Sequence, residues 1–248
     1  MAIRVDPADP DLVIAGVEGG FPSYLQGPDR PHFNGGIFRS TDGGERWTRI
    51  EIDPNDPFNG WVIETAATSP TTFVVVGDGL DDPSRALGLL RSVDGSLTWL
   101  PYEGAASLPS GVGRFAISTG GESIYLTASD TYRHWISRDG GAAWSQTEIN
   151  QSNGPVAVSP ADPQHVVFVS QTRIFRSTNG LQSLTEARFT HRARVPTDIA
   201  FRDIAFAPSD GNVVYAAKDG YLLYRSDDGG ASFTLVADIR NDVLNVIP

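Results

Sequence analysis

The stretch IFRSTDGGERW at residues 37–47 decides the fold of this chain, because four further copies of its pattern follow. The pattern is Ser-x-Asp-x-Gly-x-x-aromatic, directly after a short apolar run. The later copies begin at Ser92, Ser137, Ser177 and Ser226. The acidic or amide positions of the five copies are Asp42, Asp94, Asp139, Asn179 and Asp228, which lie 52, 45, 40 and 49 residues apart. A period of about 40–50 residues is the length of one four-stranded propeller blade.

The sequence therefore predicts an all-β fold, a β-propeller of about five four-stranded antiparallel blades, with residues 1–248 forming one domain. In the first repeat the expected strands are 3–5, 12–16, 36–39 and 47–52. The fourth strand of the fourth repeat is expected near 184–189. Runs such as 166–169 are apolar on both faces, which is typical of a strand between neighbouring blades. Because 242–248 resembles the first strand of a sixth blade, two alternatives stay open: a closed five-bladed ring, or a piece of a six- or seven-bladed ring.

We call each copy of the pattern a Ser-x-Asp turn and expect it to join the third and fourth strands of a blade. The Asp accepts bonds from N–H groups of its own turn, the Gly permits positive φ, and the Ser adds a second local bond. The final aromatic is expected to point inward and fill space between blades. The residues given this structural role are Ser40, Asp42, Gly44, Trp47, Ser92, Asp94, Trp99, Ser137, Asp139, Gly141, Trp144, Ser177, Asn179, Ser226, Asp228, Gly230 and Phe233. The fourth copy departs from the pattern, with Asn179 for Asp and Leu184 for the aromatic.

These turns resemble the Asp-box (BNR) repeats of sialidases, sortilin-type receptor domains, xyloglucan-degrading glycosidases and photosystem II assembly factors. The resemblance covers nearly the whole chain and implies a propeller. It does not imply an activity, because the repeat occurs in enzymes and in binding proteins alike.

Composition narrows the partners and the chemistry. The net charge of −11 disfavours nucleic acid and anionic membranes, and the absence of cysteine excludes disulfides and thiolate chemistry. Lys218 is the only lysine among 19 basic residues, as in proteins of GC-rich bacterial genomes. No apolar run approaches the roughly 20 residues of a membrane span, so no direct membrane insertion is expected. The N-terminus has no signal-peptide pattern; the protein is cytoplasmic if Met1 is the native start, and periplasmic or extracellular if a leader was removed.

The sequence predicts no catalytic, metal or cofactor site. A sialidase-like chain would carry an early Arg-Ile-Pro segment, but the only similar triplet, Arg194 to Pro196, comes late. Xyloglucan-degrading relatives use two propellers, and this chain is too short for two. The four histidines, His32, His134, His165 and His191, lack the spacing of zinc ligands. The acidic loops 6–11 and 78–82 match no dedicated calcium loop, so solvated turns are the favoured interpretation.

One loop breaks the repeat and is the best candidate for binding. Residues 17–35, between the second and third strands of the first repeat, are far longer than the equivalent connections. This loop is expected on the face opposite the Ser-x-Asp turns, together with the connections at 57–61 and 189–194. The candidate partner-binding residues are Phe21, Tyr24, Arg30, His32, Phe33, Trp61, His191 and Arg192. Aromatic and Arg side chains of this kind are enriched at the centres of protein interfaces.

The predicted function is therefore a non-catalytic scaffold that binds a protein partner as an accessory or assembly subunit. The alternative is a glycan-binding module or a divergent glycoside hydrolase. A third interpretation of the long loop, that it packs its aromatics on its own scaffold, is also open.

Overall fold

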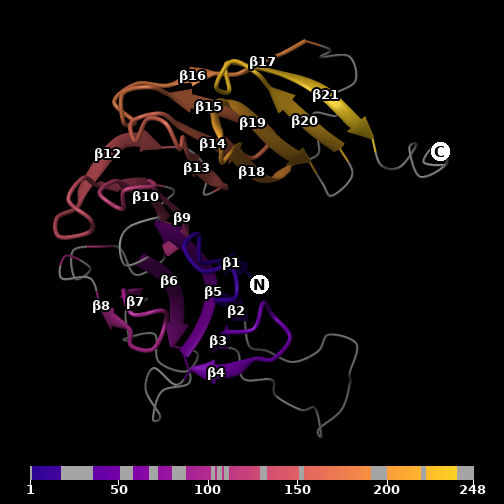
Figure 1. Ribbon diagram of the computed structural model, residues 1–248. Helices are drawn as coiled ribbons and strands as arrows, with labels where there is room; N and C mark the ends of the chain where they lie inside the picture. The colour runs from indigo at the N-terminus through magenta and orange to yellow at the C-terminus, as the bar shows by residue number, and fades with distance from the viewer. Residues whose placement is uncertain are drawn as a thin grey trace, which may run out of the picture. The chain divides into compact units, whose positions relative to one another are not determined.

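The structure is a computed structural model that describes residues 2–17, 36–50, 58–66, 72–79, 88–101, 104, 108, 112–128, 133–150, 154–190, 200–218 and 222–238. In this part of the chain the regular structure is β-strand, arranged in five sheets, and no α-helix occurs (Figure 1). Accordingly, the described residues contain no helix with the length and hydropathy needed to cross a membrane.

Each sheet corresponds to one sequence repeat, and we number the sheets as blades. Blade 1 contains β1 (Ala2–Val5), β2 (Val13–Val17), β3 (Gly36–Ser40) and β4 (Thr48–Ile50). Blade 2 contains β5 (Phe58–Ala66), β6 (Thr72–Gly79), β7 (Gly88–Ser92) and β8 (Leu100–Pro101). Blade 3 contains β9 (Val112–Ile117), β10 (Ile124–Ala128), β11 (Arg133–Ser137) and β12 (Ser145–Asn150). Blade 4 contains β13 (Val156–Val158), β14 (Val166–Ser170), β15 (Arg173–Ser177) and β16 (Thr185–Glu186). Blade 5 contains β17 (Arg188–Phe189), β18 (Phe201–Ala207), β19 (Asp210–Lys218), β20 (Leu222–Ser226) and β21 (Ser232–Asp238).

Apart from β17, strands that follow one another within a blade are antiparallel neighbours, as the repeat predicts. The Ser of each Ser-x-Asp turn ends the third strand and pairs with a residue of the second strand. Examples are Val13 with Ser40 in blade 1 and Val214 with Ser226 in blade 5. This common register lets equivalent positions in different blades be compared directly.

The fourth strand of blade 4 is shorter than predicted. The expected strand at 184–189 is divided: β16 pairs with blade 4, whereas β17 runs parallel to β21 and becomes a fifth strand of blade 5. The backbone changes partner at Ala187, whose N–H donates to Ile174 O, while the next N–H, of Arg188, donates to Ala231 O. Strand patterning alone does not reveal this change, because both partners offer free backbone groups.

The chain divides into two compact units, each considered separately. The first comprises Met1–Val112, Thr119–Gly121 and Asp139–Trp144, and it contains blades 1 and 2. The second comprises Gly113–Ser118, Glu122–Arg138 and Ser145–Pro248, and it contains most of blade 3 with blades 4 and 5.

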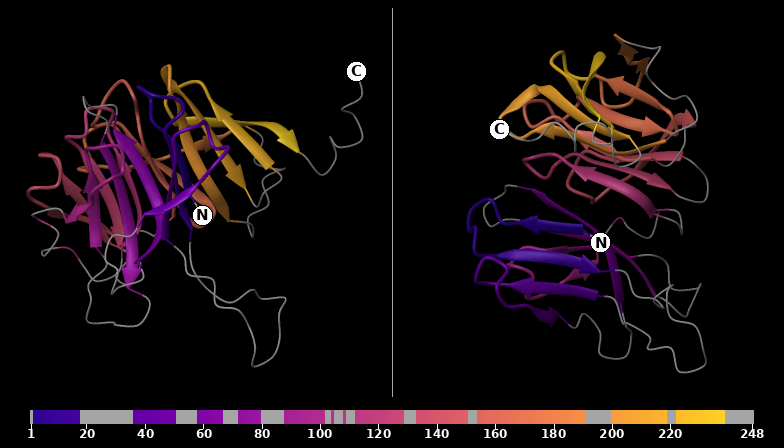
Figure 2. Two further views of the ribbon diagram at one scale, coloured as in Figure 1. Left: turned by 60° about the horizontal axis from the view of Figure 1, so that its bottom comes forward. Right: turned by 90° about the vertical axis from the view of Figure 1, so that its right-hand side faces the viewer.

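Within each unit the apolar core lies in layers between consecutive blades. Figure 2 shows blades 4 and 5 stacked face to face, in salmon to orange and in orange to yellow. We call the side of a blade that meets the next blade its leading face, and the other side its trailing face. In blade 4, Val167 and Ile174 lie on the leading face against blade 5, while Phe168 and Phe175 lie on the trailing face against blade 3. All four are at most 6% exposed, so burial on both faces of β14 is confirmed.

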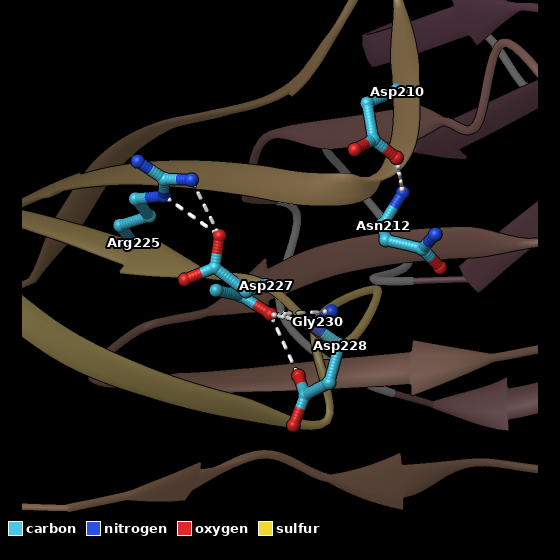
Figure 3. Close-up of polar contacts among 7 residues, drawn as sticks. Asp210, Asn212, Arg225, Asp227, Asp228 and Gly230 are labelled. Carbon is cyan, nitrogen blue, oxygen red and sulfur yellow. Dashed lines mark hydrogen bonds and ion pairs between the residues drawn. The ribbon is translucent and has the colours of Figure 1, made fainter.

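The Ser-x-Asp turns form the hydrogen bonds that their residue types favour. In blade 1, Ser40 Oγ donates to Asp42 Oδ1 at 2.7 Å and accepts from Gly44 N at 2.9 Å. Asp42 Oδ1 also accepts from Arg46 N at 2.9 Å. Equivalent bonds occur in the other blades, including blade 4, where the Asn179 side-chain oxygen replaces the carboxylate. The turn is thus held by its own Ser and Asp side chains, as in Figure 3 for blade 5.

The expectation that every terminal aromatic is buried between blades is wrong for Trp47, and Trp144 is only half-buried. Phe233 and Trp99 are 1% and 8% exposed, on the trailing faces of blades 5 and 2. Trp47 is 39% exposed, and its indole N–H donates to Gly44 O within the turn. Blade 1 covers Trp99, and blade 4 covers Phe233.

Candidate functional site

Most predicted partner-binding residues lie outside the described part of the chain. These are Phe21, Tyr24, Arg30, His32, Phe33, His191 and Arg192. The remaining one, Trp61, lies in β5, where the backbone is described and the side chain is not. The structure therefore neither brings these side chains together nor separates them. It does describe the strands on either side of residues 18–35 and of residues 191–199.

Trp61 lies inside a strand and not in a connection between blades. The predicted connection at 57–61 is wrong in this respect, because β5 already begins at Phe58. Gly60 pairs with Gly77 and Val62 with Val76, so the register shifts at Trp61. Such a β-bulge redirects the side chain of the extra residue, and bulges are enriched next to binding sites.

The long loop leaves blade 1 from two adjacent strand ends. Val17, the last residue of β2, pairs with Gly36, the first residue of β3. The Ser-x-Asp turn lies at the other end of β3, beyond Ser40. The loop thus begins and ends on a fixed pair of residues at the end of blade 1 opposite its Ser-x-Asp turn.

Residues 191–199, which include most of the predicted connection at 189–194, are flanked on both sides by an aromatic cluster of blade 5. On its N-terminal side, Thr190 N donates to Phe233 O at 3.1 Å, and the neighbouring Phe189 ring stacks on Phe233 with centroids 5.8 Å apart. On its C-terminal side, Phe201 packs on Phe189 at 5.9 Å and on Tyr224 at 5.7 Å. Both ends of the segment are therefore held by tightly packed rings.

A buried cation completes this region. Lys218 is fully buried, and its Nζ lies 4.8 Å from the centroid of the Phe201 ring. It pairs with Phe201 and Leu222, on the face of β19 that packs against blade 4. The equivalent positions in blades 1 to 4 are Val17, Gly77, Ala128 and Ser170. An alignment of the repeats could have identified this lysine, since the other repeats have small or apolar residues at its position. Burying an ammonium group is costly, and buried charged groups are often retained for a function.

Two histidines are buried at junctions between blades of the second unit. His134 is 1% exposed, its ring centroid lies 4.8 Å from that of Phe168, and burial lowers its pKa to about 4. Among the described residues its Nε2 has no hydrogen-bond partner. The Nε2 of His165 lies 2.7 Å from Gly229 O and therefore carries the proton. Burial lowers the pKa of His165, and the nearby guanidinium of Arg176, which repels the protonated ring, lowers it further.

The carboxylates with shifted pKa are held in their own turns. In Asp94, burial acts to raise the pKa, but bonds from the Thr98 hydroxyl, the Thr98 N–H and Ser92 outweigh it and lower the pKa to about 2. In Asp228, burial is likewise outweighed, by bonds from Ser232 and Ser226, and the pKa is lowered. The pKa of Asp42 is lowered chiefly by the bond from Arg46 N. A general acid at neutral pH needs the opposite shift, so these three carboxylates act as hydrogen-bond acceptors.

The acidic loop at 6–11 has the geometry of a tight turn. Asp6 Oδ1 accepts from Ala8 N at 2.8 Å, and Asp9 Oδ1 accepts from Asp11 N at 3.1 Å. No group of three His, Asp or Glu residues arranged to hold a metal ion is found in the described part of the chain. The other predicted acidic loop, 78–82, lies mostly outside the described residues.

Comparison with known proteins identifies the fold. No protein-family model and no curated protein matches this chain. Among solved structures, an ancestral GH74 enzyme has 15% identity and a TM-score of 0.63, with 95% of this chain and 30% of that chain covered. YCF48 from Cyanidioschyzon merolae has 14% identity and a TM-score of 0.58, with 94% of this chain and 83% of that chain covered. KlAtg21, in complex with the coiled coil of AgAtg16, has 9% identity and a TM-score of 0.57, with 96% of this chain and 68% of that chain covered.

This chain thus spans about a third of the GH74 enzyme and most of YCF48. Identities this low establish the fold alone. Together with the five sheets described above, they confirm that the chain is an all-β protein built as a β-propeller of four-stranded antiparallel blades.

Proposed function

We propose that this protein is a non-catalytic scaffold that binds a protein partner through the long loop 17–35 and the connection at 189–194. The observation that carries the proposal is the anchoring of these two segments. The first departs from the paired residues Val17 and Gly36, and the second from the ring cluster of Phe189 and Phe201. Binding segments on a rigid scaffold lose less conformational entropy when a partner is bound.

The composition of the two segments supports a protein partner. The first contains Phe21, Tyr24, Arg30 and Phe33, and the second contains Arg192. Aromatic residues and arginine are the types that contribute most binding free energy at protein interfaces. Among solved propellers of this fold, KlAtg21 is in complex with a coiled coil, so the fold is compatible with a protein partner.

The state of the described carboxylates also favours binding over hydrolysis. Asp42, Asp94 and Asp228 have lowered pKa values and accept bonds within their own turns. Glycoside hydrolysis requires one carboxyl group with a raised pKa and a second at a defined distance from it. The carboxylates with shifted pKa values thus have the properties of structural groups.

The proposal is tested by isolating the protein gently from its source and measuring binding of any stoichiometric partner to variants. Arg30→Ala and Phe33→Ala are each expected to weaken binding by about tenfold or more, as interface centres do. Arg46→Ala is the matched control, because Arg46 is 90% exposed in the Ser-x-Asp turn of blade 1, at the other end of β3. Unchanged affinity in both loop variants would exclude the loop as the binding site. Isolation of the protein without any other polypeptide would contradict the scaffold.

A glycan-binding role is the second candidate, and the β-bulge at Trp61 is the observation that favours it. Indole rings stack on the apolar faces of sugars, so Trp61 is the residue that this role would use. The test is binding to a panel of oligosaccharides. Loss of binding in Trp61→Ala, with full retention in Trp47→Ala, would support this role; an absence of binding by the wild-type protein would exclude it for the glycans in the panel.

A further inference from the structure

The Ser-x-Asp turn of blade 2 carries three large apolar side chains on its surface. These are Val93, Leu97 and Leu100, which are 48%, 62% and 60% exposed. Single exposed apolar residues are common on proteins, whereas a cluster of them marks a surface for interaction. We call these three residues the apolar turn surface.

The other four repeats have no large apolar residue at these positions. The turns align at their Ser residues, so each position has four counterparts. The counterparts are Thr41, Arg138, Thr178 and Asp227 for Val93; Glu45, Ala142, Gln182 and Ala231 for Leu97; and Thr48, Ser145, Thr185 and Thr234 for Leu100. In blades 1 and 4 all of these counterparts are polar and exposed. The turn therefore folds with polar residues at these solvent-facing positions, and folding does not explain the apolar residues of blade 2.

Both neighbours of this turn belong to the same compact unit. On one side, Arg39 Nε of blade 1 donates to Gly95 O at 2.6 Å. On the other side, the turn of blade 3, Asp139–Trp144, is part of the first unit. It lies close to the chain that follows β8, since a Cβ at Gly104 would be 2.5 Å from Ala142 O. The apolar turn surface is thus exposed with both neighbouring turns in place.

The surroundings of the apolar turn surface are acidic. A Cβ at Gly95 would lie 3.3 Å from Leu12 Cδ2, and Leu12 directly follows the acidic loop 6–11. Gly43 N, in the turn of blade 1, donates to Asp11 O at 3.0 Å, so this loop also contacts that turn. Residues 6–11, 40–47 and 92–99 contain six acidic residues and one basic residue, namely Asp6, Asp9, Asp11, Asp42, Glu45 and Asp94 with Arg46.

This combination selects the chemistry of the partner. Exposed apolar side chains favour apolar side chains opposite them, and an acidic surround favours lysine and arginine. A second copy of this chain would bring the same net charge of −11 and the same acidic turns, so it is disfavoured. The complementary partner is a polypeptide segment that is both apolar and basic.

We propose that the Ser-x-Asp turn of blade 2 is a second interaction surface, which binds a segment of another protein in which apolar residues lie beside lysine or arginine. The apolar residues of this segment cover Val93, Leu97 and Leu100. Its cations approach Asp94 and the acidic residues of blade 1. The long loop leaves blade 1 from the end opposite its Ser-x-Asp turn, so this surface is distinct from the one in the proposed function.

The test measures binding of three synthetic peptides of equal length by fluorescence anisotropy. One is an amphipathic peptide of leucine and lysine, one contains serine and lysine, and one contains leucine and glutamate. Only the leucine–lysine peptide is expected to bind the wild-type protein, and its affinity should fall as salt is added.

The decisive variant combines Val93→Thr, Leu97→Gln and Leu100→Thr, which gives blade 2 the residues of blade 4. It is expected to weaken binding of the leucine–lysine peptide by about tenfold or more. Val236→Thr is the control, because Val236 is a 50% exposed apolar residue in blade 5. It is expected to bind the peptide as the wild type does.

A second variant, Asp94→Asn, tests the charge alone. In blade 4 the Asn179 side-chain oxygen accepts from Ser177 Oγ and Ser183 N, so an amide also closes the turn. Loss of this exposed charge is expected to weaken binding by about threefold.

Four outcomes would overturn the proposal: no binding of the leucine–lysine peptide, equally tight binding of either other peptide, unchanged affinity in the triple variant, or unchanged affinity in Asp94→Asn. Near-ultraviolet circular dichroism establishes that each variant is folded, and Leu97→Gln alone tests the surface if the triple variant does not fold. None of these variants alters the long loop, so failure of this proposal leaves the proposed protein-binding function intact.

Discussion

The buried His134 makes a quantitative prediction about acid stability. Its ring lies in the apolar layer between blades 3 and 4, 1% exposed and against Phe168. Burial lowers its pKa from 6.5 to about 4, because the layer disfavours the charged ring. The equivalent positions in blades 1, 2 and 4 are Ile37, Leu89 and Ile174, so an aliphatic side chain fits here.

The sign of the effect follows from which state binds the proton. Above pH 6.5 the histidine is neutral in both states and contributes no pH dependence. As the pH falls below 6.5, the unfolded chain takes up a proton that the folded chain excludes until about pH 4. The free energy of unfolding should therefore fall by about 2 kcal/mol between pH 7 and 5, and by about 3 kcal/mol between pH 7 and 4.

The assay compares urea unfolding of the wild type and His134→Leu at pH 7, 5 and 4. All other titrating groups are common to both proteins, so the difference between the two stability curves isolates His134. The variant is expected to gain about 3 kcal/mol relative to wild type on going from pH 7 to pH 4. Parallel curves would refute the reasoning, because they would mean that the ring is protonated equally in the folded and unfolded states.

Three further predictions concern the Ser-x-Asp turns. Phe233→Ala should lower the free energy of unfolding by about 3–5 kcal/mol, and the more exposed Trp47→Ala by clearly less; equal losses in urea unfolding would contradict the assigned burial. Gly229 and Gly43 have nearly the same φ, +69° and +68°. Only at Gly229 would the Cβ of an alanine lie 2.5 Å from a side chain of the preceding blade. Unfolding should therefore show about 1–2 kcal/mol of backbone strain for Gly43→Ala and a larger loss for Gly229→Ala. Asp94 should titrate near 2 by NMR, so that its contribution to stability, complete above pH 3.8, is lost as the pH falls through about 2; a midpoint near 4 would refute the assigned hydrogen bonds.

The fold was accessible from sequence because its determinants are local. A Ser, an Asp and a Gly within five residues close each turn with their own hydrogen bonds, as Ser40 and Asp42 do. Repetition of this turn at blade length then determines the number and order of the strands. The burial of 166–169 on both faces follows in the same way from an apolar run between two such turns.

The features that the sequence did not predict depend on contacts with adjacent strands and blades. Burial of the terminal aromatic depends on the blade packed against it, as blade 4 covers Phe233, and not on the turn alone. The change of partner at β17 depends on which of two sheets offers the nearer backbone groups. The positive φ of the first glycine of each turn was predicted and is confirmed, whereas the close approach of His165 from the preceding blade at Gly229 was not predicted. The buried Lys218 becomes visible only when the repeats are compared in the register of their strands.

The candidate partner-binding residues were predicted from residue type and loop length. The structure describes the strands next to these residues but not their side chains. Their contribution is a matter of recognition by another molecule, which neither hydrophobic period nor turn chemistry encodes. They stay predictions, and affinity measurements on variants are the means of testing them.

The most direct test of the protein-binding scaffold is the native mass of the assembly that contains this chain when it is isolated gently from its source. The account predicts a mass that includes a second, different polypeptide at fixed stoichiometry, and loss of that polypeptide when Arg30→Ala replaces the wild type. A mass made only of copies of this chain, unaltered by Arg30→Ala, would contradict it.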